Sequence, residues 1–300
     1  MNKTKVLVVG SSGLIGSALV PFLQAHGFAV GRLLRKPQDV HPYWDIEKQL
    51  FHLQTFTAPE VIINLAGENI ADRRWTEQSK QRLIESRISS TRLLVEHFSN
   101  VSRPPKLFIN ASAIGFYGDR GRRQLDERSA PGKDFVSRLA VQWEQASQAI
   151  SESGTRLVNL RSGLVLSKNG GVLTKMLPVF KCGLGGKIGS GQQFISWIDL
   201  NDLLNGILFI ISHPQLQGPV NMVSPHPVSN QKFTQLLAKQ LKRPSLLPLP
   251  EFLVKLLFAE MGKELLLSSS NVIPKKLSDA GFEFAYATLE KSLLKQLGKQ

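Results

Sequence analysis

The first residues of the chain constrain its fold more than any other segment. An apolar run over residues 5–9 has the composition of a β-strand, and Gly10, Gly13 and Gly16 follow it in the spacing GxxGxxG before a helical pattern begins. In such a strand–turn–helix unit the first glycine permits a tight turn and the second lets the backbone approach a pyrophosphate. The third lets the helix pack closely on the strand. This context favours a dinucleotide-binding turn over a glycine-rich turn without function.

The helix after the turn would supply further groups for a pyrophosphate. Its first amides, at Leu14 and Ile15, face the turn together with the positive end of the helix dipole. Ser12 adds a hydroxyl within the turn. The residues expected to contact a bound cofactor here are Gly10, Ser12, Gly13, Leu14, Ile15 and Gly16.

Short apolar segments and amphipathic segments alternate along the first half of the chain. They predict strands at 28–34, 61–65, 106–111 and 156–160, a weak strand near 43–44, and helices at 17–26, 76–100 and 134–153. Such alternation is typical of a parallel sheet covered by helices on both faces. The predicted fold class is α/β, a Rossmann-type doubly wound parallel sheet over residues 1–165 that segments within 195–223 complete. Residues 166–300 would mainly form a smaller C-terminal substrate lobe.

The segment after the second predicted strand indicates which dinucleotide binds. Arg35-Lys36-Pro37 stands where an NAD-preferring site usually has an Asp or Glu for the ribose hydroxyls. A cation there pairs with a 2′-phosphate instead, so the pattern favours NADP, in its reduced form NADPH, over NAD. The alternative is that Arg35 is a solvated loop residue.

Two further loops follow predicted strands. Asn64, Leu65, Ala66 and Gly67 would let a ribose and a diphosphate lie against the backbone, although a simple turn explains them too. The segment 110–118 places the hydroxyl groups of Ser112 and Tyr117 near the expected nicotinamide. Both loops lie at the carboxyl ends of strands, where dinucleotides bind in sheets of this kind.

The chain is basic, with a formal net charge of +14. A basic surface attracts nucleic acid, anionic membranes and phosphorylated ligands. Because the basic residues are spread along the chain, we favour a small-molecule substrate and expect no nucleic-acid partner.

Composition also bears on the compartment. The single cysteine, Cys182, excludes an internal disulfide and fits a reducing compartment. No apolar run approaches the ~18 residues of a membrane span, and no signal peptide fits before the first strand. We therefore expect a cytoplasmic protein with no membrane partner. The histidines show no ligand spacing, so no metal site is predicted.

Motifs along nearly the whole chain resemble those of one family. They include Asn-Leu-Ala-Gly-Glu-Asn-Ile at 64–70, Arg-Trp-Thr at 74–76, Ser-Ala-Ile-Gly-Phe-Tyr-Gly at 112–118, Arg-Ser-Gly-Leu-Val-Leu at 161–166, Gly-Leu-Gly-Gly-Lys at 183–187 and Pro-Lys-Lys-Leu at 274–277. The chain resembles the atypical extended short-chain dehydrogenases/reductases of the NAD-dependent epimerase/dehydratase superfamily. Within that superfamily it resembles the YfcH-like (SDR39U) epimerase family. The resemblance implies a family-specific C-terminal region at about 245–297 and adds Arg161 to the expected cofactor-binding residues.

The resemblance also exposes a departure from the superfamily's chemistry. Extended reductases typically use a Ser or Thr, a Tyr, a Lys four residues later and an Asn, with the tyrosine as general acid or base. Counted from neighbouring motifs, the serine position holds Ala113, the tyrosine position Val136, the lysine position Ala140 and the asparagine position Arg87. The YfcH-like subgroup is similarly atypical as a whole.

Other side chains are therefore candidates for the chemistry, and the catalytic residues remain unknown. Tyr117 would donate a proton or simply pack beside Phe116. Ser112 would bind a carbonyl oxygen or the nicotinamide amide of the cofactor, or serve as a structural hydroxyl. Lys80 and Arg87 lie seven residues apart on one helix face, so both would point at the cofactor. Arg87 would bind pyrophosphate or a substrate anion because its guanidinium stays charged. Lys80 is alternatively a solvated helix residue.

The last third of the chain would form the substrate side. The glycine-rich segment 181–193 suggests a mobile loop that closes over a ligand, with Lys181, Lys187 and Gln193 as donors; a surface hairpin is the alternative. The leucines of 255–267 fit a core or dimer face in a monomer or homodimer.

Two functions remain open. One is an NADP-dependent oxidoreductase or epimerase acting on an unknown small polar or anionic substrate. The other is a catalytically silent NADP(H)-binding redox sensor or scaffold.

Overall fold

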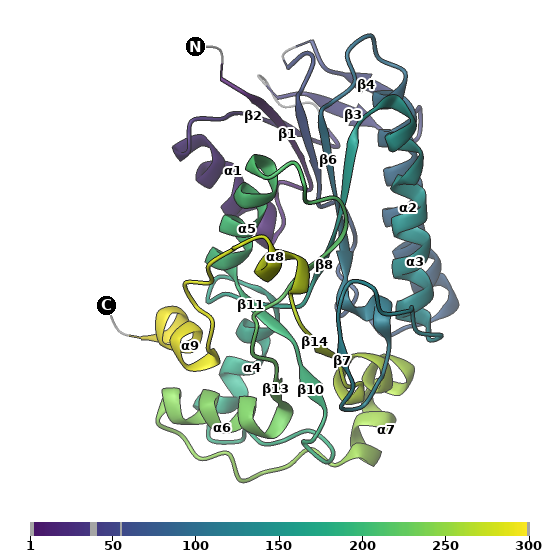
Figure 1. Ribbon diagram of the computed structural model, residues 1–300. Helices are drawn as coiled ribbons and strands as arrows, with labels where there is room; N and C mark the ends of the chain where they lie inside the picture. The colour runs from purple at the N-terminus through teal and green to yellow at the C-terminus, as the bar shows by residue number, and fades with distance from the viewer. Residues whose placement is uncertain (1–2, 37–40, 55, 299–300) are drawn as a thin grey trace.

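A six-stranded parallel sheet organises the molecule (Figure 1). The computed structural model describes residues 3–36, 41–54 and 56–298, so Pro37 of the predicted 2′-phosphate loop lies outside the described residues. In spatial order the strands are β12 (Gly218–Met222), β8 (Arg156–Ser162), β6 (Leu107–Ala113), β5 (Val61–Asn64), β1 (Lys5–Val9) and β2 (Ala29–Leu33). The strand order reverses at β1, between β2 and β5. Ligands of such sheets bind at this switch point, outside the carboxyl ends of the strands.

Helices cover both faces of the sheet. α1 (Leu14–Ala25) and α5 (Leu200–Ser212) pack on one face, and α2 (Glu77–Ser99) and α3 (Phe135–Ser147) lie side by side on the other (Figure 1). Within β1, Val8 packs in the same cluster as Leu19 of α1, whereas Leu7 packs with Phe98 of α2. Because strand side chains alternate between faces, a continuous apolar strand is buried on both sides. The predicted α/β doubly wound fold is confirmed.

Most predicted elements have their expected positions, with three differences. α2 begins after the N-cap Thr76 and ends at the C-cap Asn100, as predicted. α1 starts at Leu14 instead of residue 17, and the segment predicted as one helix over 134–153 changes into a 3-10 helix, η2 (Gln148–Ser153). The weak strand near 43–44 is β3 (Tyr43–Asp45), which pairs with β4 (Leu50–His52) outside the main sheet.

Residues 114–125 and the second half of the chain add further short strands and helices. They are η1 (Ile114–Tyr117), β7 (Gln124–Leu125), β9 (Leu164–Leu166), α4 (Gly171–Lys181), β10 (Phe194–Ile195), β11 (Trp197–Asp199), β13 (Val228–Ser229), α6 (Asn230–Leu241), α7 (Glu251–Gly262), the π-helical η3 (Lys263–Leu267), β14 (Asn271–Val272), α8 (Lys275–Asp279) and α9 (Leu289–Leu297). β12 returns from this half to the sheet, within the range 195–223. The division into domains at residue 165 stays a prediction. No helix of the described residues is long and apolar enough to cross a membrane.

The glycine-rich segment 181–193 is held by hydrogen bonds. Leu249 N–H donates to Lys187 O over 2.8 Å, and Gly189 N–H donates to Leu249 O over 2.9 Å. The amide of Gln193 donates to Ile188 O and Leu266 O, so this side chain fixes the loop from inside. In this structure these hydrogen bonds hold the segment, which was predicted to be a mobile loop, against residues 249 and 266. The amide of Gln193 donates to backbone oxygens and is not available to a substrate.

The N-cap of α2 offers a test of local stability. Thr76 Oγ1 accepts from Ser79 N–H while Ser79 Oγ accepts from Thr76 N–H. We expect Thr76→Ala to lower the free energy of unfolding in urea by about 1 kcal/mol, because it leaves a helix N–H without its partner. Thr288→Ala is the matched control, since Thr288 caps α9 without a side-chain hydrogen bond. Equal losses in the two variants would contradict this account.

Candidate functional site

The glycine turn forms the centre of the candidate site. Gly10 has a φ of +76°, and a Cβ added there would lie 2.7 Å from the carbonyl carbon of Leu65. A Cβ on Gly16 would overlap the carbonyl oxygen of Gly10. Both glycines are therefore required by close backbone packing. A Cβ on Gly13 would meet Gly10 O at 3.5 Å and no closer atom, so the protein's own packing does not demand this glycine. The exposed Gly13 leaves the outer face of the turn open to a ligand.

The first turn of α1 presents backbone donors at the same place. No side chain caps the helix, and no acidic residue lies in its first turn. The N-terminal amides and the helix dipole thus face outward over Gly13 and Leu14, an arrangement that favours an anion such as a pyrophosphate.

A cavity of about 570 Å³ lies between the glycine turn (residues 10–13) and the residues that follow β5 (65–68, called the β5 loop). We call it the nucleotide groove; its lining residues are Val9, Gly10, Ser11, Ser12, Gly13, Leu33, Leu34, Arg35, Trp44, Leu65, Ala66, Gly67, Glu68 and Ser86. Of the residues predicted to bind the cofactor, Gly10, Ser12, Gly13, Arg35, Leu65, Ala66 and Gly67 line it. Leu14 lines a neighbouring cavity of about 390 Å³ with Ser17 and Asn169. Ile15 packs against the core, and Gly16 is buried beneath the turn.

Some lining residues were not predicted from the sequence. Trp44 comes from the short strand β3 and is almost fully buried at one wall of the groove. Arg32, on β2, does not line the groove but donates from Nε to Ser11 Oγ over 3.2 Å, and Ser11 is a lining residue. Because Arg35 lines the groove and Arg32 is held at its lining residue Ser11, this part of the groove suits a phosphate group.

Asn64 and Arg87 shape the groove from behind. The buried Asn64 amide donates to Thr91 Oγ1 and Asn110 Oδ1, and its Oδ1 accepts from Ala66 N–H. Arg87 Nη2 donates to Glu68 O over 2.7 Å, and its guanidinium lies 5.0 Å from the ring centroid of Trp143. Burial lowers the pKa of Arg87 to about 10, so it is still cationic at neutral pH. Both side chains therefore fix the β5 loop and do not line the groove.

Ser112, Tyr117 and Arg161 belong to one buried polar network with Glu144 and Asn221. Arg161 makes a bidentate pair with Glu144, with both N–O distances at 2.8 Å. Ser112 Oγ donates to Glu144 Oε1 over 2.7 Å, and Arg161 Nη1 donates to the Tyr117 hydroxyl over 3.0 Å. That hydroxyl in turn donates to Asn221 Oδ1 over 2.7 Å. Burial raises the pKa of Tyr117 to about 12, which keeps the phenol protonated.

Lys80 points toward the C-terminal half and away from the groove. Its Nζ lies 2.5 Å from a carboxylate oxygen of Glu260 on α7 and 5.1 Å from the ring centroid of Phe135. The hydrogen bond with Glu260 is the main cause of its raised pKa. Lys80 therefore joins α2 to α7.

The superfamily's tyrosine position is apolar in this chain. Val136 lies against Gly115, where an added Cβ would overlap it, and it packs with Leu83, Leu139 and Leu265. At the lysine position, Ala140 is buried. A typical Tyr-Lys pair is thus absent in space as well as in sequence.

Glu264 is the carboxylate beside that position. It accepts N–H bonds from Phe135, over 3.2 Å, and from Val136, over 3.0 Å, at the start of α3. Burial raises its pKa, although the two N–H bonds lower it. Nothing local in the sequence predicts this contact, because Glu264 lies 128 residues from Val136.

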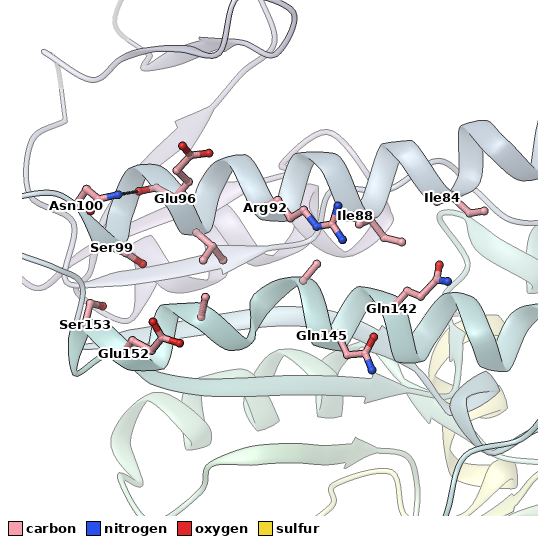
Figure 2. A pocket seen from close by; sticks show the side chains of 13 residues that line it. Ile84, Ile88, Arg92, Glu96, Ser99, Asn100, Gln142, Gln145, Glu152 and Ser153 are labelled. Carbon is pink, nitrogen blue, oxygen red and sulfur yellow. Dashed lines mark hydrogen bonds between the residues drawn. The ribbon is translucent and has the colours of Figure 1, made fainter.

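A larger cavity, about 980 Å³, lies between α2 and α3 (Figure 2). Its lining combines Ile84 and Ile88 with polar side chains such as Arg92, Gln142 and Gln145. It contains no part of the glycine turn, so its size does not make it the nucleotide site. No group of His, Cys, Asp and Glu within the described residues could hold a metal ion.

A doubly wound sheet with a glycine turn and an open groove at its switch point defines a Rossmann-type dinucleotide-binding protein. The model of the NAD dependent epimerase/dehydratase family matches residues 6–224, and that of a domain of unknown function, DUF1731, matches residues 249–295. The chain belongs to the NAD dependent epimerase/dehydratase family.

Relatives align along nearly the whole chain. Epimerase family protein Mb2239 of Mycobacterium bovis is 40% identical over 297 residues, which cover 98% of this chain and 97% of that protein. Epimerase family protein SDR39U1 of Homo sapiens is 35% identical over 294 residues, covering 96% and 98%. The crystal structure of human SDR39U1 (isoform 2) with NADPH superposes with a TM-score of 0.91 at 33% identity, covering 99% of this chain and 100% of that one. The resemblance found in the motifs is confirmed.

The buried tyrosine provides a test of the network. A phenol whose pKa is about 12 in the folded protein and ~10 in the unfolded chain adds stability below pH ~10. That contribution is lost as the pH rises through ~10 to ~12, since only the unfolded chain ionises readily there. In the wild type this ionisation lowers the free energy of unfolding by about 3 kcal/mol between pH ~10 and pH ~12. We expect the Tyr117→Phe variant to lack this loss, because phenylalanine does not ionise.

The measurement is urea unfolding at several alkaline pH values, with phenolate absorbance followed on the folded protein. Tyr43→Phe is the control. A wild-type spectrum in which all tyrosines ionise together near pH ~10 would show that Tyr117 is not held as described.

Proposed function

We propose that this chain binds NADPH in the nucleotide groove and uses it in a reaction on a small polar or anionic substrate. It would thus act as an atypical oxidoreductase or epimerase. The observation that carries the proposal is the groove itself, with an open turn at Gly13 and with Arg35 at its rim. NADPH in the crystal structure of human SDR39U1 supports the choice of cofactor.

The chain's own residues have distinct roles in this proposal. The backbone amides of Gly13 and Leu14 bind the pyrophosphate, as the uncapped helix start allows. Arg35 binds the 2′-phosphate, and Arg32, held at Ser11, adds positive charge nearby. When bound, NADPH supplies a hydride from its nicotinamide.

Proton transfer would differ from that of the superfamily. The Tyr117 proton is directed to Asn221 and its pKa is about 12, so this hydroxyl is a poor proton donor at neutral pH. The candidate Ser112 is engaged by Glu144 and the candidate Lys80 by Glu260. We therefore propose that the proton needed after hydride transfer comes from water or from the substrate.

We place the protein in the cytoplasm and assign it a small-molecule substrate. The lone, exposed Cys182 suits a reducing compartment. The spread of basic residues argues against a nucleic-acid interface.

The second candidate is an NADPH-binding protein without turnover, a redox sensor or scaffold. The observation that favours it is the replacement of the Tyr-Lys pair by Val136 and Ala140, both buried. In this case the groove would bind the cofactor in the same way, and only the chemistry would be missing.

Cofactor choice is tested by fluorescence titration with NADPH and NADH. We expect tighter binding of NADPH, because a guanidinium contacts its 2′-phosphate. Arg35→Ala should weaken NADPH binding about tenfold to a hundredfold, as the loss of one charge-assisted hydrogen bond implies, and leave NADH binding unchanged. Arg103→Ala, at an exposed arginine outside the groove, is the matched control. Equal affinities of the wild type for the two cofactors would overturn the NADPH assignment.

Turnover is tested by following NADPH oxidation with a panel of carbonyl compounds and nucleotide sugars. An enzyme should transfer deuterium from 4-deuterated NADPH to one product, and Tyr117→Phe should keep at least about half of the rate because this hydroxyl is not the donor. A rate lost in the folded Tyr117→Phe variant would refute our assignment of the proton. NADPH binding with neither cofactor oxidation nor an epimerised product across the panel would select the sensor, because an epimerase returns the hydride and consumes no cofactor.

A further inference from the structure

The exposed large apolar side chains gather in one region of the C-terminal half. Seven of the nine that the described residues contain lie there, with exposed fractions of 45% to 81%. We call them the apolar patch: Val179, Leu184, Leu246, Leu247, Phe252, Leu256 and Leu257. Isolated exposed leucines are ordinary in soluble proteins, but a concentration of this kind marks an interaction surface.

Backbone contacts hold most of the patch together. The turn after α4 lies against the connector between α6 and α7, through the Leu249–Lys187 hydrogen bond and through Arg243 Nε, which donates to Lys181 O over 2.9 Å. The connector leads directly into α7, and both lie at the end of the molecule far from β3 and β4 (Figure 1). The segments that contain the patch are therefore held in place by hydrogen bonds to one another.

The outward face of α7 is well defined. Phe252 and Leu256 are four residues apart and share one helix face, with 67% and 73% of their surfaces exposed. Val254 is fully buried, so the side of the helix that carries it packs against the rest of the protein, and a hydrogen bond from Arg74 Nη2 to Leu257 O also attaches the helix. Both exposed side chains are thus presented on a fixed support.

The charged residues in the segments that carry the patch are mostly basic. The stretches 179–187 and 242–257 contain five basic residues, Lys181, Lys187, Lys242, Arg243 and Lys255, and one acidic residue, Glu251. Glu251 pairs with Lys255 at 2.6 Å. Exposed apolar side chains on segments with an excess of basic residues are complementary to an anionic lipid surface, into which apolar side chains insert beside phosphate groups.

We propose that the apolar patch docks this protein on the surface of an anionic lipid bilayer. Phe252, Leu256 and Leu246 enter the interfacial layer, and the lysines and Arg243 contact the headgroup phosphates. A symmetric contact with a second copy is disfavoured because it would bring the five basic residues of each copy together. The proposal replaces the expectation of no membrane partner, which rested on the absence of a spanning segment. Surface docking needs no such segment.

The chain contains its own attachment point for a probe. Cys182 is the single cysteine, is exposed, and lies in the turn between Val179 and Leu184. An environment-sensitive NBD label on Cys182 should shift to shorter wavelength with phosphatidylcholine vesicles that contain about one-third phosphatidylglycerol. The shift should be small with pure phosphatidylcholine and should fall when the salt rises from ~0.1 M to ~0.5 M.

Two variants separate the apolar and the charged contributions, with vesicle sedimentation as an independent readout. Phe252→Ser/Leu256→Ser should weaken binding at least about tenfold without changing the unfolding midpoint, because these side chains are exposed. Lys181→Glu/Lys242→Glu should weaken it similarly while keeping every apolar side chain. Leu50→Ser/Leu294→Ser removes the two exposed leucines outside the patch and should bind like the wild type.

Several results would overturn the proposal. They are no binding to the anionic vesicles, equal binding to neutral vesicles, or unchanged binding in either patch variant. Concentration-dependent dimerisation without lipid, abolished by Phe252→Ser/Leu256→Ser, would assign the patch to a second copy instead. None of these results depends on whether the protein binds NADPH or turns over a substrate.

Discussion

The close approach of backbones at the glycine turn is the constraint on which the nucleotide groove depends. Gly10 brings the end of β1 against Leu65 and Ala66, and Gly16 brings α1 against Gly10 itself. Any side chain at these two positions would push the β5 loop and the helix away from the strand. Gly13, in contrast, has no close neighbour in the protein. Packing explains two glycines of the motif, and space for a ligand explains the third.

A second constraint is the cost of burying Arg161. Its guanidinium is almost inaccessible, and an unpaired charge in such a place would cost several kcal/mol. Glu144 neutralises it through two short hydrogen bonds, and the Tyr117 hydroxyl accepts a third donor. The Ser112 hydroxyl donates a further hydrogen bond to the Glu144 carboxylate. Residue types that serve catalysis in related enzymes therefore satisfy a buried ion pair here, although they lie at the carboxyl end of the expected strand.

Local patterns predicted the parts of the site that depend on neighbours in sequence. The glycine turn, the bounds of α2 and the loop after β5 lie where their residues indicate, because turn chemistry and helix ends depend on a few neighbouring residues. The spacing of Lys80 and Arg87 also correctly placed both on one helix face. That face packs on Phe135 and Trp143 of α3, however, and not on the groove.

The rest depended on contacts between distant segments, which periodicity cannot reveal. Trp44 reaches the groove from a strand of three residues, too short to show a pattern. Glu264 meets the start of α3 from the far end of the chain. The family resemblance predicted Arg161 as a cofactor-binding residue. Its ion-pair partner Glu144 lies on α3, and only the packing of α3 against the sheet shows that the two side chains meet. Whether Arg161 also contacts the cofactor stays a prediction.

These distant contacts also attach the C-terminal region to the helices beside the nucleotide groove. α7 and η3 are tied to the Rossmann half by Lys80–Glu260, by Arg74 with Leu257 O, and by Glu264 at the start of α3. α2, which carries Lys80, also supplies Ser86 to the groove. α7 is thus attached to the rest of the protein by the buried Val254 and by polar contacts with α2, whereas Phe252 and Leu256 are exposed. A helix that served only to stabilise the fold would bury its large apolar side chains; the exposure of Phe252 and Leu256 is the feature on which the proposed contact with a lipid surface rests.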